Sequence, residues 1–184
     1  MHIHLGQEPL TYSGQQLRSH WIFDRFGLLG DAIVAFVGPC DVDLRHMVDL
    51  VDVAAGEIIR SRSMLHFIAE FFTAPLEVTI LRQRLLVALA GDLLSAAGVA
   101  SLRRSGDDLY VQDRKLSVSI ATASAVSTLI HLGINIDPEG APVPAIGLQE
   151  LDVEPHRFAA DLMDGFTAEL RSIALARAKV RPVP

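Results

Sequence analysis

Lys115 is the charged residue whose position most invites chemistry. It stands near the head of the run 113–137, DRKLSVSIATASAVSTLIHLGINID, which is largely apolar and rich in hydroxyl side chains. A lysine there either marks the solvent edge of a strand or reaches into a site beside it. Ser117 and Ser119 share its face at the two-residue period of a strand. The residues expected to face the core are Leu116, Val118 and Ile120. A compact ammonium can stabilise developing negative charge, so a site is possible, but the residues alone leave both interpretations open.

Two histidines in predicted strands are the next candidates. His66 and His131 each stand on an apolar background, where a histidine is usually a hydrogen-bonded core residue. If both face the cavity beside Lys115, one of them can serve as a general base, because an unperturbed histidine has a pKa of about 6.5. Glu70, on the same strand face as His66, is then placed to orient the base. Both interpretations remain open at this stage.

An acidic stretch and the single cysteine suggest two other chemistries. A divalent-metal cluster would draw on His46 and four carboxylates, namely Asp41, Asp43, Asp49 and Asp52. Their spacing matches no known ligand set, so a solvated strand face is the simpler interpretation and no metal is expected. Cys40 has His46 six residues further on, as a cysteine nucleophile and its base might require, but a small buried thiol explains it equally well.

The elements that must position these residues are strands followed by helices. Strands are predicted over 31–38, 46–53 and 63–72, and again over 100–106, 107–113, 114–122 and 126–136. In the third, Met64 and His66 share one face, whereas Leu65 and Phe67 share the other. The last four strands should form an antiparallel meander, followed by a proline-rich loop over 138–147. These elements predict an α+β protein with a mainly antiparallel sheet and packed helices.

Helical periodicity marks two segments. The first spans 76–97 and ends at Gly98, with the predicted apolar stripe Val78, Leu81, Leu85, Leu89 and Leu93. The second opens at Pro155, with the predicted apolar face Phe158, Leu162, Phe166, Leu170 and Ile173. Each helix should lay this face on the sheet.

Composition limits the class of protein. The 184 residues suggest a single domain over 1–184, and the net charge of −6 argues against duplex nucleic acid as a partner. A single cysteine suits a reducing compartment, so a cytoplasmic location is expected. No secretory signal is visible, and the most apolar region, 85–99, is too short to cross a membrane. A mean hydropathy of +0.33 suggests a subunit contact, hence a homo-oligomer.

A family resemblance rests on the lysine strand and its neighbours. The stretch 108–136, DLYVQDRKLSVSIATASAVSTLIHLGINI, resembles the central segment of biotin and lipoate protein ligases and octanoyl transferases. The matching positions are Asp108, Lys115, His131, Gly133 and Asn135. The chain is identified as a member of the family called domain of unknown function 366 on GPCDVD, MLHFIAEFF, RKLSVSIATAS, IHLGINI and KVRPV. The resemblance implies a biotin/lipoate ligase-like fold, which is class II synthetase-like.

The chain also departs from these enzymes. Adenylating ligases carry a basic, glycine-rich segment that holds ATP phosphates, whereas IRSRSMLHF here keeps Arg60 and Arg62 without the glycines. ATP use, and any cofactor, is therefore left open. The octanoyl transferases use a cysteine beyond the lysine strands, but Cys40 lies well before them. Their covalent mechanism does not carry over.

These observations predict an acyl-group ligase or transferase that acts on a carboxylic acid or its activated form. The expected catalytic residues are Lys115, His66 and His131. The expected substrate-binding residues are Arg60, Arg62, Ser117, Ser119, Gly133, Asn135 and Glu70. One alternative is a non-catalytic module of the same fold that binds a small carboxylate or a nucleotide. A cysteine- or metal-dependent hydrolase has the least support.

Overall fold

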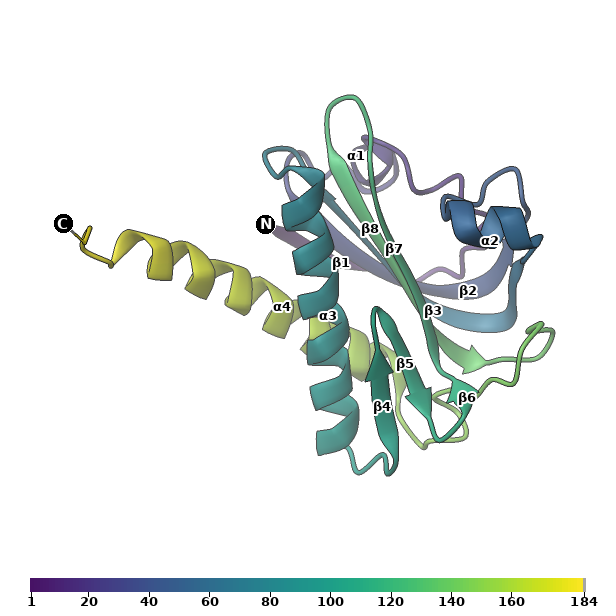
Figure 1. Ribbon diagram of the computed structural model, residues 1–184. Helices are drawn as coiled ribbons and strands as arrows, with labels where there is room; N and C mark the ends of the chain where they lie inside the picture. Colours follow the sequence, from purple (N-terminus) through teal and green to yellow (C-terminus); the bar gives the residue numbers. More distant parts are fainter. Residues whose placement is uncertain (184) are drawn as a thin grey trace.

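A five-stranded sheet and a smaller three-stranded sheet form the frame of the molecule (Figure 1). The computed structural model describes residues 1–183. The large sheet has the order β1 (His2–Leu5), β2 (Ala32–Val42), β3 (Ile59–Phe71), β8 (Thr128–Asp137), β7 (Ser117–Ala123). Only its β1–β2 pair is parallel. The small sheet consists of β4 (Leu102–Ser105), β5 (Asp108–Val111) and β6 (Arg114–Lys115). The predicted α+β class with a mainly antiparallel sheet is confirmed.

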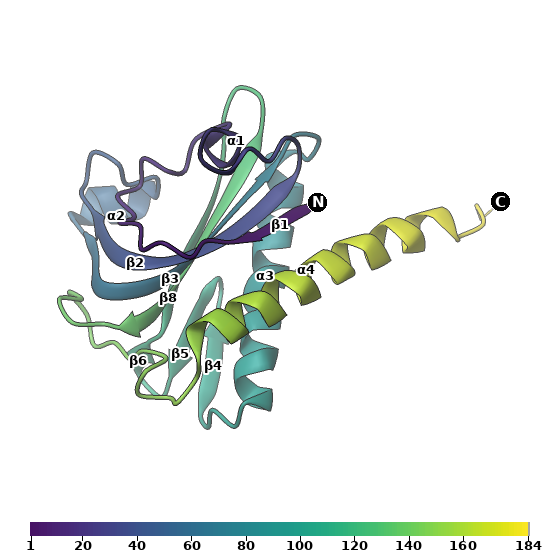
Figure 2. The ribbon, with the colours of Figure 1, turned by 180° about the vertical axis from the view of Figure 1, so that it is seen from behind.

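The two faces of the large sheet are covered by different parts of the chain. Leu65, Phe67 and Phe71 of β3 pack into a core with α3 (Leu76–Ala96) and α4 (Pro155–Ala178). Met64 and Ile68 belong to a second core on the opposite face. That core is closed by the N-terminal segment and α1 (Trp21–Phe26), as Figures 1 and 2 show. The predicted division of β3 into two faces is confirmed.

The prediction of a strand over 46–53 is wrong, because the helix α2 (Leu50–Ala55) begins within this acidic stretch. Asp49 caps this helix by accepting hydrogen bonds from the backbone N–H groups of Val51 (2.8 Å) and Asp52 (3.3 Å). Gly56 ends it with a φ of 69°. These two helix caps outweigh the alternation of apolar and polar residues that predicted a strand. The strand β1 and the helix α1 were not predicted.

The buried face of α3 differs from the predicted stripe. The residues that pack inward are Thr79, Gln83, Leu86, Val87, Ala90 and Leu94. Leu81, from the predicted stripe, is 64% exposed. Leu85, Leu89 and Leu93 of the predicted stripe are partly buried and pack against the core, so the periodicity located the inner face only in part. On α4 the prediction is confirmed for Phe158, Leu162 and Phe166, which are buried.

The lysine strand predicted over 114–122 is broken at Leu116. Arg114 and Lys115 pair with β5 in the small sheet, whereas β7 begins at Ser117 and pairs with β8 in the large one. Lys115 also pairs with the proline-rich loop: its N–H donates to the carbonyl of Pro144 (2.9 Å), and its carbonyl accepts from the N–H of Ile146 (3.1 Å). Lys115 therefore lies at the junction between the sheets. Within residues 1–183, none of the helices is long and apolar enough to cross a bilayer.

The inner face of α3 leads to a prediction about stability. Leu86→Ala should lower the free energy of unfolding by about 2–5 kcal/mol, because Leu86 is fully buried and its loss leaves a cavity. Leu81→Ala is the matched control and should change this energy by no more than about 0.5 kcal/mol. Chemical denaturation of the two variants measures the difference. Equal losses would contradict the observed orientation of α3.

Candidate functional site

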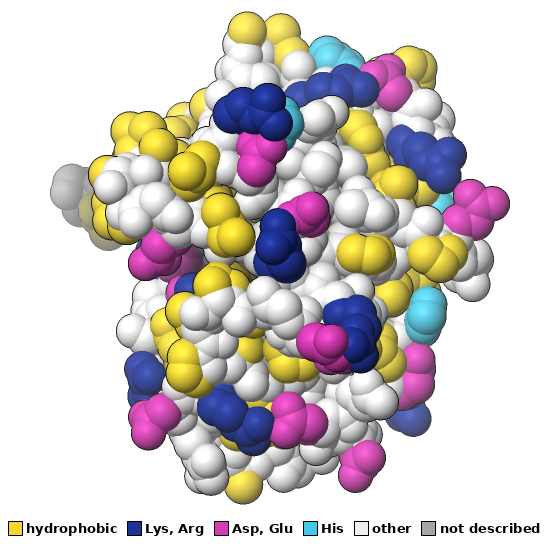
Figure 3. Space-filling view, turned by 90° about the vertical axis from the view of Figure 1, so that its right-hand side faces the viewer, with side chains coloured by type: hydrophobic (Ala, Val, Ile, Leu, Met, Phe, Trp, Pro, Cys, Tyr) yellow, Lys and Arg dark blue, Asp and Glu magenta, His cyan; other side chains and the backbone are white. Residues whose placement is uncertain are grey.

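A cavity of about 210 Å³ lies beside the junction between the two sheets. This volume is below the range of about 300–1,000 Å³ for drug-sized ligands, so the ligand it encloses must be small. The apolar lining of the cavity includes Val42, Met47, Ile59, Met64, Val118 and Ile120. Figure 3 looks onto the end of the molecule that carries α2 and β6, where basic and acidic side chains are interspersed. The cavity thus combines apolar walls with a polar, charged rim.

Val118 and Ile120 correct the expected alternation of the lysine strand. Both were predicted to face the core, but both line the cavity. The break at Leu116 explains this difference, because the two-residue period does not continue from β6 into β7. Leu116 itself is buried in the core, as predicted.

Lys115 lines the cavity and forms an ion pair with Asp108. Its Nζ lies 2.8 Å from a carboxylate oxygen of Asp108, and their side chains are 29% and 21% exposed. Burial acts to lower the pKa of Lys115, but the hydrogen bond and charge of Asp108 outweigh it, so the pKa is raised. Burial raises the pKa of Asp108 despite the opposing effect of Lys115. The lysine is therefore held in its charged form.

The rim of the cavity is acidic. Besides Asp108, the lining carboxylates are Asp49, Asp52, Glu57 and Asp107. Burial, followed by the charges of Asp49 and Glu57, raises the pKa of Asp52. The basic side chains of the lining are Arg60 and Lys115. A free polyanion would therefore meet net repulsion at this rim.

The two arginines predicted to bind substrate both form ion pairs with carboxylates. Arg60 lines the cavity, and its guanidinium donates to Asp41 at 3.0 and 3.1 Å. Arg62 lies outside the lining and pairs with Asp137 and Glu139. The structure does not bring Arg62 together with Lys115.

The two histidines touch each other, but only one lines the cavity. His66 Nδ1 lies 3.1 Å from His131 Nε2, and both residues are buried, at 0% and 3% exposed. His131 lines the cavity, whereas His66 is outside the lining and fully buried. Burial lowers the pKa of His66 to about 3. Burial, followed by the influence of His66, also lowers the pKa of His131 far below its usual value. Both rings are therefore neutral near pH 7.

Tyr12 is a member of the site that the sequence did not suggest. Its ring stacks on His131 with centroids 3.8 Å apart and planes at 7°. Its N–H donates to the carbonyl of Pro39 (2.9 Å), and its carbonyl accepts from the N–H of Asp41 (2.9 Å). A lone tyrosine in a polar N-terminal segment carries no pattern that predicts this position.

Besides Arg60, two of the predicted substrate-binding residues line the cavity. Ser119 does so while its hydroxyl donates to the carbonyl of Asp107 (3.1 Å) and accepts from Gln83 (2.8 Å). Asn135 does so while its amide donates to the carbonyl of Lys115 (3.3 Å). Asn135 thus supports the backbone that positions Lys115.

The other three predicted residues have different surroundings. Ser117 is buried outside the lining, and its hydroxyl accepts from the N–H of Leu109 (2.8 Å). Gly133 also lies outside the lining, and a side chain there would collide with the sulfur of Met64. Glu70 does not orient either histidine.

Glu70 instead ties together two distant segments. Its carboxylate accepts from the N–H of His20 (2.9 Å) and the hydroxyl of Ser127 (2.6 Å). Because its strand position places it beyond the two histidines, its role is to hold the loops at that end of the sheet.

The hydrolase alternative gains nothing from the geometry. Cys40 is buried, and burial, together with the charge of Asp41, raises its thiol pKa to about 12. His46 lies beside Asp43 (3.5 Å) and Gln15 (3.4 Å). Among residues 1–183, His, Cys, Asp and Glu side chains do not gather in threes around a possible metal position.

Comparison with known proteins identifies relatives of unknown activity. The family model described as Domain of unknown function (DUF366) matches residues 1–181. An uncharacterized protein of Methanocaldococcus jannaschii is 38% identical over 160 residues, which are 84% of this chain and 72% of that protein. A solved protein of unknown function from Pyrococcus horikoshi has a TM-score of 0.93 at 38% identity, over 99% of this chain and 98% of that one.

More distant solved structures share the fold. A T. acidophilum protein assigned as a lipoate protein ligase, with lipoic acid bound, has a TM-score of 0.60 at 13% identity, over 93% and 86% of the two chains. A biotin protein ligase from Aquifex aeolicus in complex with biotin and ATP has a TM-score of 0.58 at 15% identity, over 92% and 70%. The predicted biotin/lipoate ligase-like fold is confirmed, and at these identities the likeness concerns the fold alone.

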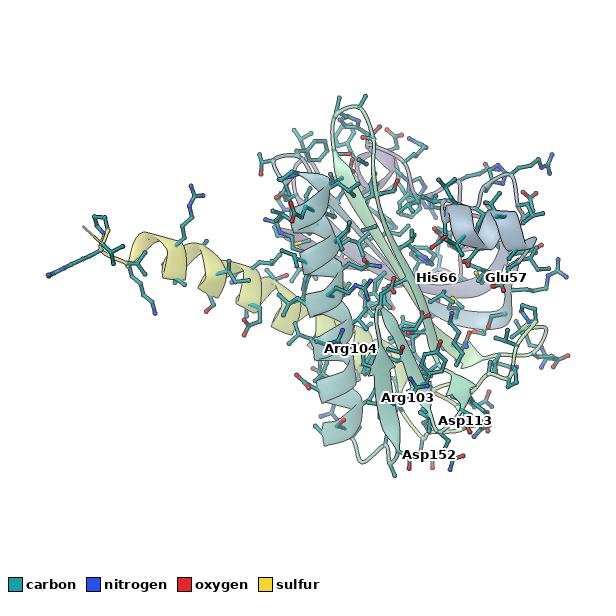
Figure 4. All side chains as sticks on the ribbon, in the orientation of Figure 1. Glu57, His66, Arg103, Arg104, Asp113 and Asp152 are labelled. Atoms are coloured by element: carbon teal, nitrogen blue, oxygen red, sulfur yellow. The ribbon has the colours of Figure 1, made fainter. Side chains whose placement is uncertain are left out.

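The Lys115–Asp108 pair leads to a prediction about ionisation. Asp108→Asn should lower the pKa of Lys115, because burial then acts against a weaker opposing charge. The chain contains two lysines, Lys115 and the exposed Lys179, so NMR of isotope-labelled lysine gives two assignable signals. Asp113→Asn, on the turn between β5 and β6 (Figure 4), is the control and should leave the pKa unchanged. An unchanged pKa in Asp108→Asn would contradict the pairing.

Proposed function

We propose that this chain, which belongs to the DUF366 family, binds an acyl group in its cavity and transfers it from an activated form to an acceptor. The observation that carries the proposal is the charged, half-buried Lys115 in the lining of a cavity that combines apolar walls with a charged rim. An acyl group has the matching chemistry, because an apolar chain ends in a polar carbonyl. The relatives of the same fold named above hold lipoic acid and biotin, which are both carboxylic acids.

Lys115 has the donors that this role requires. An ammonium group carries three N–H donors, and Asp108 accepts one of them. The remaining donors are available for a carbonyl oxygen of the ligand. A compact cation in a partly desolvated position stabilises the oxyanion that forms as the carbonyl is attacked.

The charges of the rim favour a neutral activated acyl group over a nucleotide. Asp49, Asp52 and Asp107 oppose a polyphosphate, and Arg60 is already paired with Asp41. A thioester or ester is uncharged at its reacting carbonyl and meets no such repulsion. We therefore place acyl transfer ahead of ATP-dependent ligation.

The proposed step exchanges one acyl bond for another. The nitrogen, oxygen or sulfur of the acceptor bonds to the carbonyl carbon, and the bond from that carbon to the leaving group breaks. The proton lost by the acceptor is taken up by the leaving group. The products are the acylated acceptor and the free thiol or alcohol, with no oxidant or reductant required.

A non-catalytic binding module is the second candidate. It is supported by the lowered pKa values of His66 and His131, which make both rings weak bases, and by the pairing of Lys115 with Asp108. The two candidates differ in turnover, because a module would bind the acyl compound without releasing its thiol.

Substitution of Lys115 tests the proposal. Wild-type protein should be stabilised by octanoyl-N-acetylcysteamine, because a ligand that binds only the folded state raises the melting temperature. Lys115→Met should lose most of this thermal shift, since a charge-assisted hydrogen bond contributes about 1.5–3 kcal/mol. Thiol release with hydroxylamine as a small acceptor should fall in parallel.

The neighbouring arginine provides the control. Arg114 pairs with Glu150 (2.8 Å) outside the cavity lining, so Arg114→Met should keep the full ligand response. Binding without thiol release would favour the module. Absence of binding by wild type, or full binding by Lys115→Met, would refute a carbonyl-binding role of the lysine.

A further inference from the structure

We infer that His131 presents a fixed hydrogen-bond acceptor, its Nδ1, to the cavity, and that the acyl chain bound there carries an N–H or O–H group. The inference rests on the proposed function for the identity of the ligand. The tautomer assigned to the His131 ring follows from the His66–His131 pair alone. The inference goes further than the acyl class by naming a polar group within the chain.

The hydrogen bond that His66 makes to the backbone fixes the donors and acceptors of the histidine pair. His66 Nε2 lies 3.3 Å from the carbonyl oxygen of Gly38. A carbonyl only accepts, so Nε2 of His66 must carry the proton. In a neutral imidazole the other nitrogen is then an acceptor, which leaves Nδ1 of His66 unprotonated.

The same logic fixes the tautomer of His131. Its Nε2 lies 3.1 Å from the unprotonated Nδ1 of His66 and must therefore donate. In the neutral ring, Nδ1 of His131 is consequently an acceptor. This nitrogen has no hydrogen-bond partner among residues 1–183, and His131 is the histidine of the pair that lines the cavity. Stacking on Tyr12 holds the ring plane.

The unpaired Nδ1 of His131 should favour ligands that carry a hydrogen-bond donor over ligands that do not. A ligand with an N–H or O–H group can donate a hydrogen bond to Nδ1. A plain hydrocarbon chain would remove water from Nδ1 without replacing the hydrogen bond, which costs binding free energy. His131 pairs with Ile120 of β7, five residues beyond Lys115 and past the break at Leu116. The donor group therefore belongs toward the far end of the acyl chain, away from the carbonyl.

NMR of isotope-labelled histidine tests the tautomer without any ligand. The signal of His131, identified by its loss in His131→Phe, should show a protonated Nε2 and a bare Nδ1 from mildly acidic to mildly alkaline pH. In His66→Phe the preference of His131 for the Nε2-protonated tautomer should weaken, because Nδ1 of His66 no longer accepts its hydrogen bond. A protonated Nδ1 in the wild type would overturn the inference and leave the proposed function untouched.

A matched pair of ligands tests the consequence. Wild type should bind ω-hydroxyoctanoyl-N-acetylcysteamine roughly tenfold more tightly than the octanoyl compound. In His131→Phe, which keeps a ring to stack on Tyr12, this preference should disappear. Equal binding by wild type would overturn the inference about the ligand. If His131→Phe does not fold, the wild-type comparison and the tautomer still decide.

A second, independent inference concerns α4. Its first half packs on the sheet through Phe158, Leu162 and Phe166, and its second half leaves the body of the molecule (Figures 1 and 2). The same stripe continues through Leu170 to Ile173, which is 53% exposed. The apolar face is thus longer than the surface of the chain that covers it.

One pair of charges on α4 matches a second copy of the same helix in the opposite direction. Glu169 precedes Ile173 and Arg177 follows it, whereas Arg157 near the start of the helix lies beside Asp161. Glu169 and Arg177 form no ion pair within residues 1–183, and each is four residues from Ile173. In a two-fold antiparallel pair centred on Ile173, Glu169 lies opposite the partner's Arg177. We propose that α4 mediates such a homodimer.

A charge reversal distinguishes this dimer from other assemblies. Wild type should sediment as a dimer, and Glu169→Arg or Arg177→Glu should each weaken the dimer by about tenfold or more, because like charges then face each other. The double variant should regain the dimer, since both pairs are restored in reverse. A monomeric wild type, or a double variant no better than the single ones, would overturn the proposal.

Discussion

Leu116 is fully buried where the chain leaves the small sheet and enters the large one, and its backbone is bonded on both sides. Its N–H donates to the carbonyl of Leu109 (2.8 Å), and its carbonyl accepts from the N–H of Asn135 (2.9 Å). The junction therefore cannot slide without breaking two ladders and exposing a core side chain. Lys115 owes its position beside the cavity to this anchor, and the proline-rich loop fixes it from the other side.

The charges around Lys115 follow from partial burial. A half-buried ammonium without a counter-ion is unfavourable, and Asp108 provides one. The Arg60–Asp41 and Arg62–Asp137 pairs are more exposed, so burial plays a smaller part in them. Under the proposed function, a neutral carbonyl would join the existing Lys115–Asp108 pair, whereas an anion would have to displace a carboxylate.

The sequence predicted the fold class because it is visible in short-range patterns, and it drew attention to Lys115, which lines the cavity. Alternation in β3 separated Met64 from Leu65 correctly, and Pro155 marked the start of α4. The sequence could not fully show the rotation of α3, since that helix is apolar nearly all round. It could not place Tyr12 or separate Ser117 from the cavity either, because both depend on contacts between distant segments.

The walls of the cavity come from four stretches that are far apart in the chain, near residue 12 and over 42–64, 107–120 and 131–145. Bringing such segments together requires closing long loops, which slows folding and delays contacts of high sequence separation. Tyr12 pairs with β2 at Cys40, beside the bulge between Gly38 and Cys40. The pocket is therefore expected to be completed later in folding than the hairpin contacts of the sheet.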